Sequence, residues 1–464
     1  MSRTDWPTAS PAMFPSVVLP CLLVLSLIVG AVTHRPLPGE IAAVCAVLWI
    51  ATQWTRLIPL ARLFSGIAAA VCLAMWALWP GALDSLMTAL VQGTGFAALM
   101  LCLGFLRDPV RRAPLTQRAA AYLLSYPPRR RYGTILAGAQ FMALMFNVGF
   151  IAMIGDLTRT SGPRDGQDDP DRRSMVVAAM RGAAVVSIWS PLSLGFAIVT
   201  TGVAGIEPLP LIALAFAFSA LMLGVSALWP MLPPEARPGI PTGPLPPRRH
   251  LSAMLSVLGI SSLLLGLAVA CHLGLDVSFT MASIIVLPLT AILWLIVESG
   301  GGREFRTRLT GAFETMGSMR SEGALFLSAN VIGAALSVMI QANPLWSVLS
   351  GPAFAGLPTL LALLVLIPLA AALYLPNSVM VVLAAQIFGP TLLGQDHPLA
   401  LGLTFCIGWA IAICVNPISA MSLLAARFTG VSPSRLAYGW NIRFALVSAV
   451  MAALWITAVY QWES

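Results

Sequence analysis

The chain has 464 residues, of which 58% are hydrophobic and only 9% are charged. A soluble protein of this length needs many more charged side chains on its surface, so the composition excludes a soluble fold and predicts a polytopic helical membrane protein. The formal charge of +8 rests on 26 basic residues that are all arginine and form no separate domain, which argues against a nucleic-acid partner.

Eleven apolar runs approach the length of about 20 residues that a helix needs to cross a bilayer. They do not alternate between apolar and polar residues, which excludes a transmembrane β-barrel. In chain order the predicted spans are 14–33, 40–56, 60–79, 83–106, 182–205, 207–231, 250–273, 276–298, 323–341, 398–426 and 438–460. The first is too long for the core of a signal peptide and lacks a clear cleavage site, so we keep it as a span.

Between the fourth and fifth spans, the apolar segment 133–157 cannot be a simple span. Arginines crowd the loop 107–132 before it and the loop 158–173 after it, and the positive-inside rule places both loops in the cytoplasm. A segment that starts and ends on one side predicts a re-entrant hairpin, turning at Asn147-Val148-Gly149. Non-helical backbone at that depth is tolerated only where it is buried in protein or lines a water-filled cavity.

A second hairpin is predicted at 357–392, centred on Pro376-Asn377-Ser378. It lies in a stretch without arginine, from Ser321 to Ala426, so its ends are expected outside. The proline- and arginine-rich stretch 232–249 predicts a stiff cytoplasmic linker between an N-terminal half, 1–231, and a C-terminal half, 250–464. With eleven spans, the N-terminus is expected in the cytoplasm and the C-terminus outside a bacterial inner membrane.

Two short motifs recur at a nearly constant offset in the numbering, which indicates a duplication. The offset from Asn147 to Asn377 is 377 − 147 = 230. The offset from Ser190-Pro191-Leu192-Ser193 to Asn416-Pro417-Ile418-Ser419 is 417 − 191 = 226. The opposite charge around the two copies predicts inverted repeats. A proline inside a span removes a backbone donor and frees a carbonyl, so helices near 182–205 and 398–426 are expected to be unwound.

The candidate ligand-binding residues lie at the two hairpin tips and the two unwound helices. They are Asn147, Val148, Gly149, Ser190, Pro191, Ser193, Asn377, Ser378, Asn416, Pro417 and Ser419. A site with almost no formal charge suits an anion held by helix N-termini and neutral donors, and equally a sodium ion held by neutral oxygens. The asparagines alternatively only cap the half-helices. Arg181 begins the span that leads to Ser190, where an anion-attracting role and an interfacial anchor both stay open.

Leu375-Pro376-Asn377-Ser378 and the unwound Asn416 motif resemble the ion transporter superfamily. That group includes divalent anion–sodium symporters, citrate transporters, arsenite-type exporters and the large membrane subunits of tripartite periplasmic transporters. Phe146-Asn147-Val148 and the Ser190 motif resemble the first-half copies. The resemblance implies two inverted repeats, elevator-type transport and a homodimer. Phe146, Pro376 and Val148 stand where the family carries hydroxyl residues, which favours a bulkier or more apolar organic anion over a dicarboxylate.

The function predicted is therefore secondary active transport of a small organic or inorganic anion, coupled to Na⁺ or H⁺, with no cofactor. The alternative is a membrane subunit of a multi-protein transport or lipid-handling complex, whose partner would dock on the arginine-rich loops. A membrane enzyme is the weakest alternative, since no catalytic motif is present.

Overall fold

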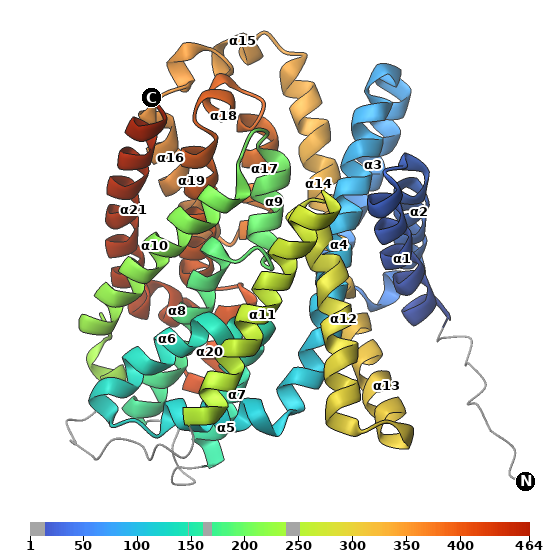
Figure 1. The fold of residues 1–464 in the computed structure, drawn as a ribbon. Helices are drawn as coiled ribbons and strands as arrows, with labels where there is room; N and C mark the ends of the chain where they lie inside the picture. The colour runs from blue at the N-terminus through green and yellow to red at the C-terminus, as the bar shows by residue number, and fades with distance from the viewer. Residues whose placement is uncertain (1–13, 147, 161–168, 238–250) are drawn as a thin grey trace, which may run out of the picture. The chain divides into compact units, whose positions relative to one another are not determined.

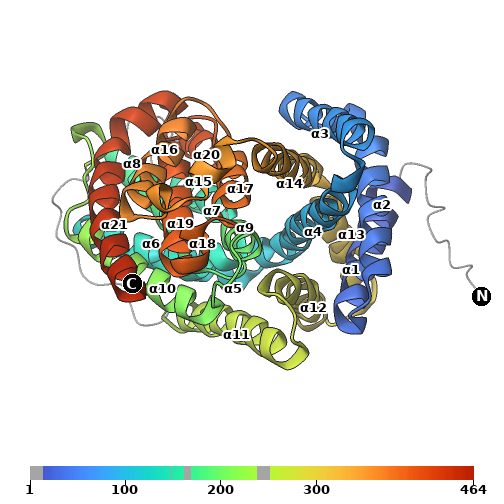
Figure 2. The ribbon, with the colours of Figure 1, turned by 90° about the horizontal axis from the view of Figure 1, so that it is seen from above.

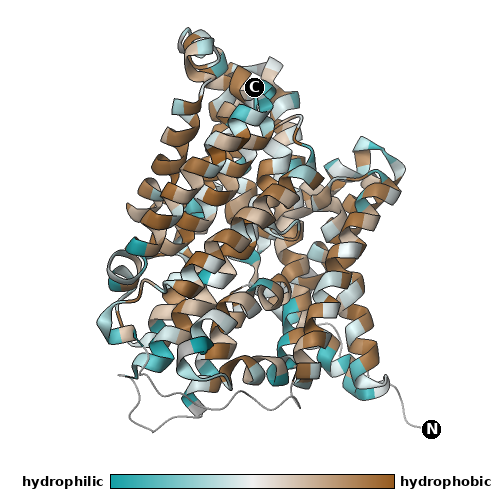
Figure 3. Ribbon diagram, turned by 60° about the vertical axis from the view of Figure 1, so that its left-hand side comes forward, coloured by the Kyte–Doolittle hydropathy of each residue, from teal (hydrophilic) through white to brown (hydrophobic). Residues whose placement is uncertain are grey.

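The computed structural model describes residues 14–146, 148–160, 169–237 and 251–464, and every regular element in these ranges is a helix. Ten helical segments among them are long and apolar enough to cross a membrane. The remaining predicted span, 40–56, corresponds to α2 (Pro36–Thr52), an apolar helix of 17 residues. Figure 3 shows hydrophobic residues along the long helices and hydrophilic residues gathered toward the helix ends and connections. The prediction of an all-α polytopic membrane protein is confirmed.

The chain divides into two compact units, and neither coincides with a sequence half. Unit 1 comprises residues 1–109 and 267–338, and unit 2 comprises residues 110–266 and 339–464. The division falls inside three helices, α4 (Leu83–Arg112), α11 (Leu251–Leu275) and α14 (Arg320–Gln341). Each unit therefore contains segments from both predicted halves, and the division into halves stays a prediction.

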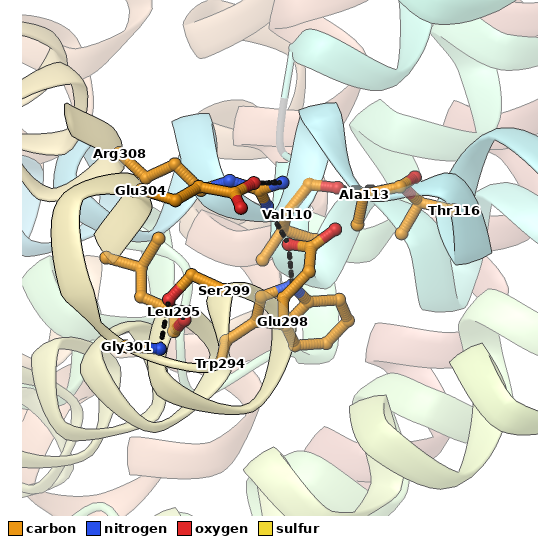
Figure 4. A network of polar contacts seen from close by, with 10 residues as sticks. All are labelled: Val110, Ala113, Thr116, Trp294, Leu295, Glu298, Ser299, Gly301, Glu304 and Arg308. Carbon is orange, nitrogen blue, oxygen red and sulfur yellow. Dashed lines mark hydrogen bonds and ion pairs between the residues drawn. The ribbon is translucent and has the colours of Figure 1, made fainter. Parts of the chain in front are cut away.

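Unit 1 contains, besides parts of the three shared helices, α1 (Leu19–Thr33), α2, α3 (Pro59–Leu78), α12 (Phe279–Ser299) and α13 (Gly302–Ser318). A Cβ added at Gly93 would lie 3.0 Å from the backbone of Leu327, so α4 and α14 cross closely there. Glu298 at the end of α12 forms an ion pair with Arg308 of α13 at 2.9 Å and accepts a hydrogen bond from the indole of Trp294 at 3.2 Å (Figure 4). These contacts fix the turn between α12 and α13.

Unit 2 contains all the candidate site residues that the structure describes. Its helices from the first half are α5 (Pro114–Leu124), α6 (Pro128–Phe146), α7 (Gly149–Thr160), α8 (Pro170–Trp189), α9 (Leu194–Gly202) and α10 (Pro208–Leu228). Those from the second half are α15 (Leu345–Leu349), α16 (Leu357–Ala372), α17 (Asn377–Phe388), α18 (Leu392–Asp396), α19 (Pro398–Val415), α20 (Ala420–Thr429) and α21 (Ile442–Glu463). The almost wholly buried α8 and α19 pack against each other and form its core.

The packing of unit 2 repeats itself between the two sets of helices. α6 packs on α8 as α16 packs on α19, and α10 packs on α8 as α21 packs on α19. α7 contacts α20 of the other half, and α17 correspondingly contacts α9, beside which it lies in both views (Figures 1 and 2). Within unit 2 the pair α6–α7 lies toward the lower end of Figure 1 and the pair α16–α17 toward the upper end.

Candidate functional site

The first non-helical break in a span lies between α8 and α9. α8 ends at Trp189, α9 begins at Leu194, and Ser190 and Ser193 both have extended backbone angles. Pro191 cannot donate a backbone hydrogen bond, so the helix cannot continue through it unperturbed. The Ser190 hydroxyl accepts from the Leu192 amide at 3.2 Å. The Ser193 hydroxyl accepts from the Phe196 amide at 3.3 Å, which caps α9, and donates to the Ser187 carbonyl at 3.1 Å.

The second break, between α19 and α20, is built from the same bonds. The Asn416 side-chain oxygen accepts from the Ile418 amide at 3.0 Å. The Ser419 hydroxyl accepts from the Ser422 amide at 3.1 Å and donates to the Ile413 carbonyl at 2.9 Å. Each position follows its counterpart at the same offset, since 418 − 192, 422 − 196 and 413 − 187 are all 226. The spacing in the sequence is thus matched by the spacing of the hydrogen bonds.

The first hairpin tip lies between α6, which ends at Phe146, and α7, which begins at Gly149. Asn147 lies outside the described residues. Val148 is half-buried, and Gly149 is buried.

The second hairpin tip lies between α16, which ends at Ala372, and α17, which begins at Asn377. Tyr374 has a φ of 66°, in the left-handed region, which lets the chain reverse there. The Asn416 amide group donates to the Leu375 carbonyl at 3.1 Å. This bond joins the tip to the second break, although the two motifs are well separated along the chain.

The two asparagines of the second half therefore differ in what their amides do. Asn416 is buried, and its amide is used at both ends by Leu375 and Ile418. Asn377 is half-buried, and its side chain has no hydrogen-bond partner among the described residues. Ser378, the next residue on α17, is buried. A side-chain amide offers one acceptor and two donors. Of these two asparagines, Asn377 is the one whose amide is available to bind a ligand.

Each hairpin is pressed against the short helix of the other half at a glycine. A Cβ added at Gly155 of α7 would lie 2.3 Å from the Phe428 ring of α20. A Cβ added at Gly202 of α9 would lie 2.7 Å from the Cβ of Ala385 on α17. These are equivalent pairs, because 385 − 155 is 230 and 428 − 202 is 226. The structure thus brings each hairpin onto the helix that follows the opposite break.

Arg181 lies in the interior of unit 2 with none of its surface exposed. Its guanidinium donates to four oxygens, those of the Asn441 side chain at 2.9 Å, the Tyr132 hydroxyl at 2.8 Å, the Trp440 carbonyl at 2.8 Å and the Pro230 carbonyl at 2.5 Å. Its Cζ also lies 4.7 Å from the centroid of the Phe444 ring. A side chain enclosed in this way cannot anchor the helix to lipid headgroups, so the interfacial interpretation is wrong.

The first residues of the predicted linker contact the start of α8 and the short helical segment Arg435–Trp440 that follows α20. Glu235 accepts from the Trp440 indole at 2.8 Å and from Arg435 at 2.9 Å, and its carbonyl accepts from Arg173 at 3.4 Å. The hydrogen bond from Trp440 lowers the pKa of the Glu235 carboxyl, so it stays charged at neutral pH. Residues 238–249 of the linker lie outside the described part of the chain.

No family model matches this chain, and no curated protein matches it. Among solved structures, it is similar to the YdaH transporter of Alcanivorax borkumensis, whose crystal structure is described as revealing an unusual topology. The two share 15% sequence identity with a TM-score of 0.52, over 87% of this chain and 96% of that chain. At this identity the likeness shows the fold: both chains are polytopic, helical membrane proteins of the same architecture.

Proposed function

We propose that this chain is a secondary active transporter of a small organic or inorganic anion, coupled to Na⁺ or H⁺. The observation that carries the proposal is the pair of breaks, at Ser190–Ser193 and Asn416–Ser419, built from the same bonds in one unit. Discontinuous helices in inverted repeats are the places where secondary transporters bind substrate and coupling ions. The solved transporter with the same fold supports this class of function.

The chemistry of the site favours an anion as cargo. The candidate residues include no acidic side chain, and Asn377 presents an amide without a partner among the described residues. The first turns of α9 and α20 each point backbone amides toward a break, and helix N-termini attract negative charge. A coupling Na⁺ would be held by neutral backbone and side-chain oxygens.

We further propose elevator-type alternating access within the ion transporter superfamily, with unit 2 as the moving part. It holds both hairpins and both broken helices, and each hairpin is pressed against the opposite short helix. If unit 2 moved as a rigid body, the two tips and the two breaks would move together with the bound cargo. Unit 1 would serve as the scaffold of a homodimer in a bacterial inner membrane, with the N-terminus in the cytoplasm. A cysteine at Asp396 that reacted with an impermeant thiol reagent only from the cytoplasmic side would contradict this orientation.

Counterflow in proteoliposomes tests the proposal. Vesicles loaded with members of an anion panel, including monocarboxylates, dicarboxylates, aromatic acids and inorganic oxyanions, should accumulate the matching labelled anion. Imposing a Na⁺ or a proton gradient in separate experiments identifies the coupling ion, because only the coupled gradient should drive net uptake. Vesicles without the protein are the control. Failure to accumulate any anion under either gradient would count against the proposed function.

A further inference from the structure

The guanidinium of Arg181, fully buried in unit 2, is surrounded by neutral groups. We propose that Arg181 makes the transporter select negatively charged cargo. Its charge would make both breaks electropositive without touching the bound molecule. The inference rests on the proposed function above and deepens it, since it names a residue that would select anions over neutral molecules and cations.

The surroundings of Arg181 do not balance its charge. Its partners are two backbone carbonyls, one amide oxygen, one hydroxyl and one aromatic face. No carboxylate among the described residues lies within ion-pair distance of it. A guanidinium keeps its charge in proteins, and burying an unpaired charge is costly even when its donors are bonded. An apolar residue could fill this position at lower cost, which points to a use for the charge itself.

Both breaks lie within reach of this charge. Ser190 follows Arg181 by nine residues on the same helix, a distance of about 14 Å along the axis. The same Asn441 that accepts from Arg181 donates to the Cys414 carbonyl at 3.3 Å, two residues before Asn416. At about 14 Å and an effective dielectric constant of about 20, Coulomb's law gives a preference of somewhat under tenfold for a monovalent anion over a neutral molecule. For a divalent anion the factor is roughly 50, and a cation is disfavoured as strongly as a monovalent anion is favoured.

The contacts of Arg181 also hold helices together, and a purely structural role is the competing explanation. The Tyr132 hydroxyl of α6 accepts a hydrogen bond from Arg181. It also shares a hydrogen bond of 3.0 Å with the Ser226 hydroxyl of α10. Loss of the guanidinium would therefore lower stability in either case. The two explanations differ in whether the effect depends on the charge at the break.

A thiol placed in the second break measures that charge without any knowledge of the cargo. The side chain of Ile418 is not enclosed by protein, being 39% exposed, so a membrane-permeant alkylating reagent is used on Ile418→Cys, and mass spectrometry separates it from the native cysteines. A nearby positive charge favours the thiolate. In full-length protein, Arg181→Gln should move the midpoint of the rate–pH profile up by about one unit, a tenfold change in thiolate fraction.

Three further variants keep the result interpretable. Asn441→Asp retains an acceptor for Arg181 but balances its charge, so it should shift the midpoint upward like Arg181→Gln and covers the case in which that variant does not fold. Arg181→Lys keeps the charge and should leave the midpoint within about 0.3 units of the parent. Tyr132→Phe removes one bond to the guanidinium at constant charge and serves as the matched control for packing.

Transport separates this inference from the proposed function. With the anion found by counterflow, Arg181→Gln and Asn441→Asp should raise KM about tenfold per negative charge of the cargo and leave kcat within about twofold. Unchanged midpoints in both variants, or an equal shift in Tyr132→Phe, would overturn the role of Arg181. A shifted midpoint without any transported anion would instead contradict the proposed function and leave the electrostatic result standing.

Discussion

Replacing Asn377 with alanine is expected to reduce kcat/KM for transport by about 100-fold and to leave the stability of the protein nearly unchanged. The amide of Asn377 has no hydrogen-bond partner among the described residues, so its removal breaks no bond within that part of the fold. A hydrogen bond to a charged ligand contributes about 1.5–3 kcal/mol, which corresponds to roughly a 10- to 150-fold loss, and the expected effect lies toward the upper end of that range. Initial rates in proteoliposomes and thermal unfolding in detergent measure the two effects.

Asn416→Ala is the matched comparison, because it removes the same amide from a position where the fold uses it. The Leu375 carbonyl and the Ile418 amide would both lose their partner, so we expect a loss of about 1–3 kcal/mol in stability. If Asn377→Ala were as destabilising as Asn416→Ala, or if it transported at the wild-type rate, Asn377 would not be a ligand-binding residue.

Gly155→Leu is expected to prevent α7 from packing on α20 and to lower the free energy of unfolding by about 3 kcal/mol. Even a Cβ at this position would lie 2.3 Å from the Phe428 ring, which is itself buried, so the side chain has nowhere to go. The yield of monodisperse protein after extraction and its melting temperature measure the effect. Gly224→Leu, on α10, is the control, because a Cβ there meets nothing within 4 Å.

The second close contact, at Gly202, suggests a rescue for this one. The equivalent pair in the other half has alanine on the hairpin helix and glycine on the short helix, Ala385 and Gly202. Gly155→Ala alone should be destabilising, and adding Phe428→Gly should recover part of the loss because it reproduces the other half's arrangement. If the double variant lost more free energy of unfolding than the two single variants together, the two contacts would not be equivalent.

The fold class and the positions of the breaks could be predicted from local features of the sequence. Hydropathy marks the spans because a helix in lipid must be apolar along its length. Pro191 and Pro417 mark the breaks because proline removes a backbone donor wherever it stands. The constant offset between the two motifs in the sequence also holds for the residues that form their hydrogen bonds.

The long-range partners could not be predicted, because the sequence does not show which backbone groups meet. Arg181 is held by the carbonyls of Pro230 and Trp440, and a carbonyl oxygen has no signature in the sequence. The bond from Asn416 to Leu375 likewise joins a side chain to a main-chain oxygen at the other motif.

The glycine contacts between the hairpins and the short helices could have been predicted from the sequence. Gly155 and Gly202 lie at the same offsets from Ala385 and Phe428 as the motifs do from each other. A glycine matched to a larger residue at such an offset indicates a close approach in one copy that the other copy accommodates differently. The division into inverted halves stays a prediction.

Because the same hydrogen bonds recur at the two breaks, matching residues have the same local structure but different neighbours. Ser193 and Ser419 make the same two hydrogen bonds, yet one precedes a helix that meets hairpin α17 and the other a helix that meets hairpin α7. When each serine is replaced by alanine, the local cost of losing a helix cap, about 1 kcal/mol, enters both variants and cancels in their difference. What remains after subtraction reports how much the different surroundings of the two serines contribute to stability and transport.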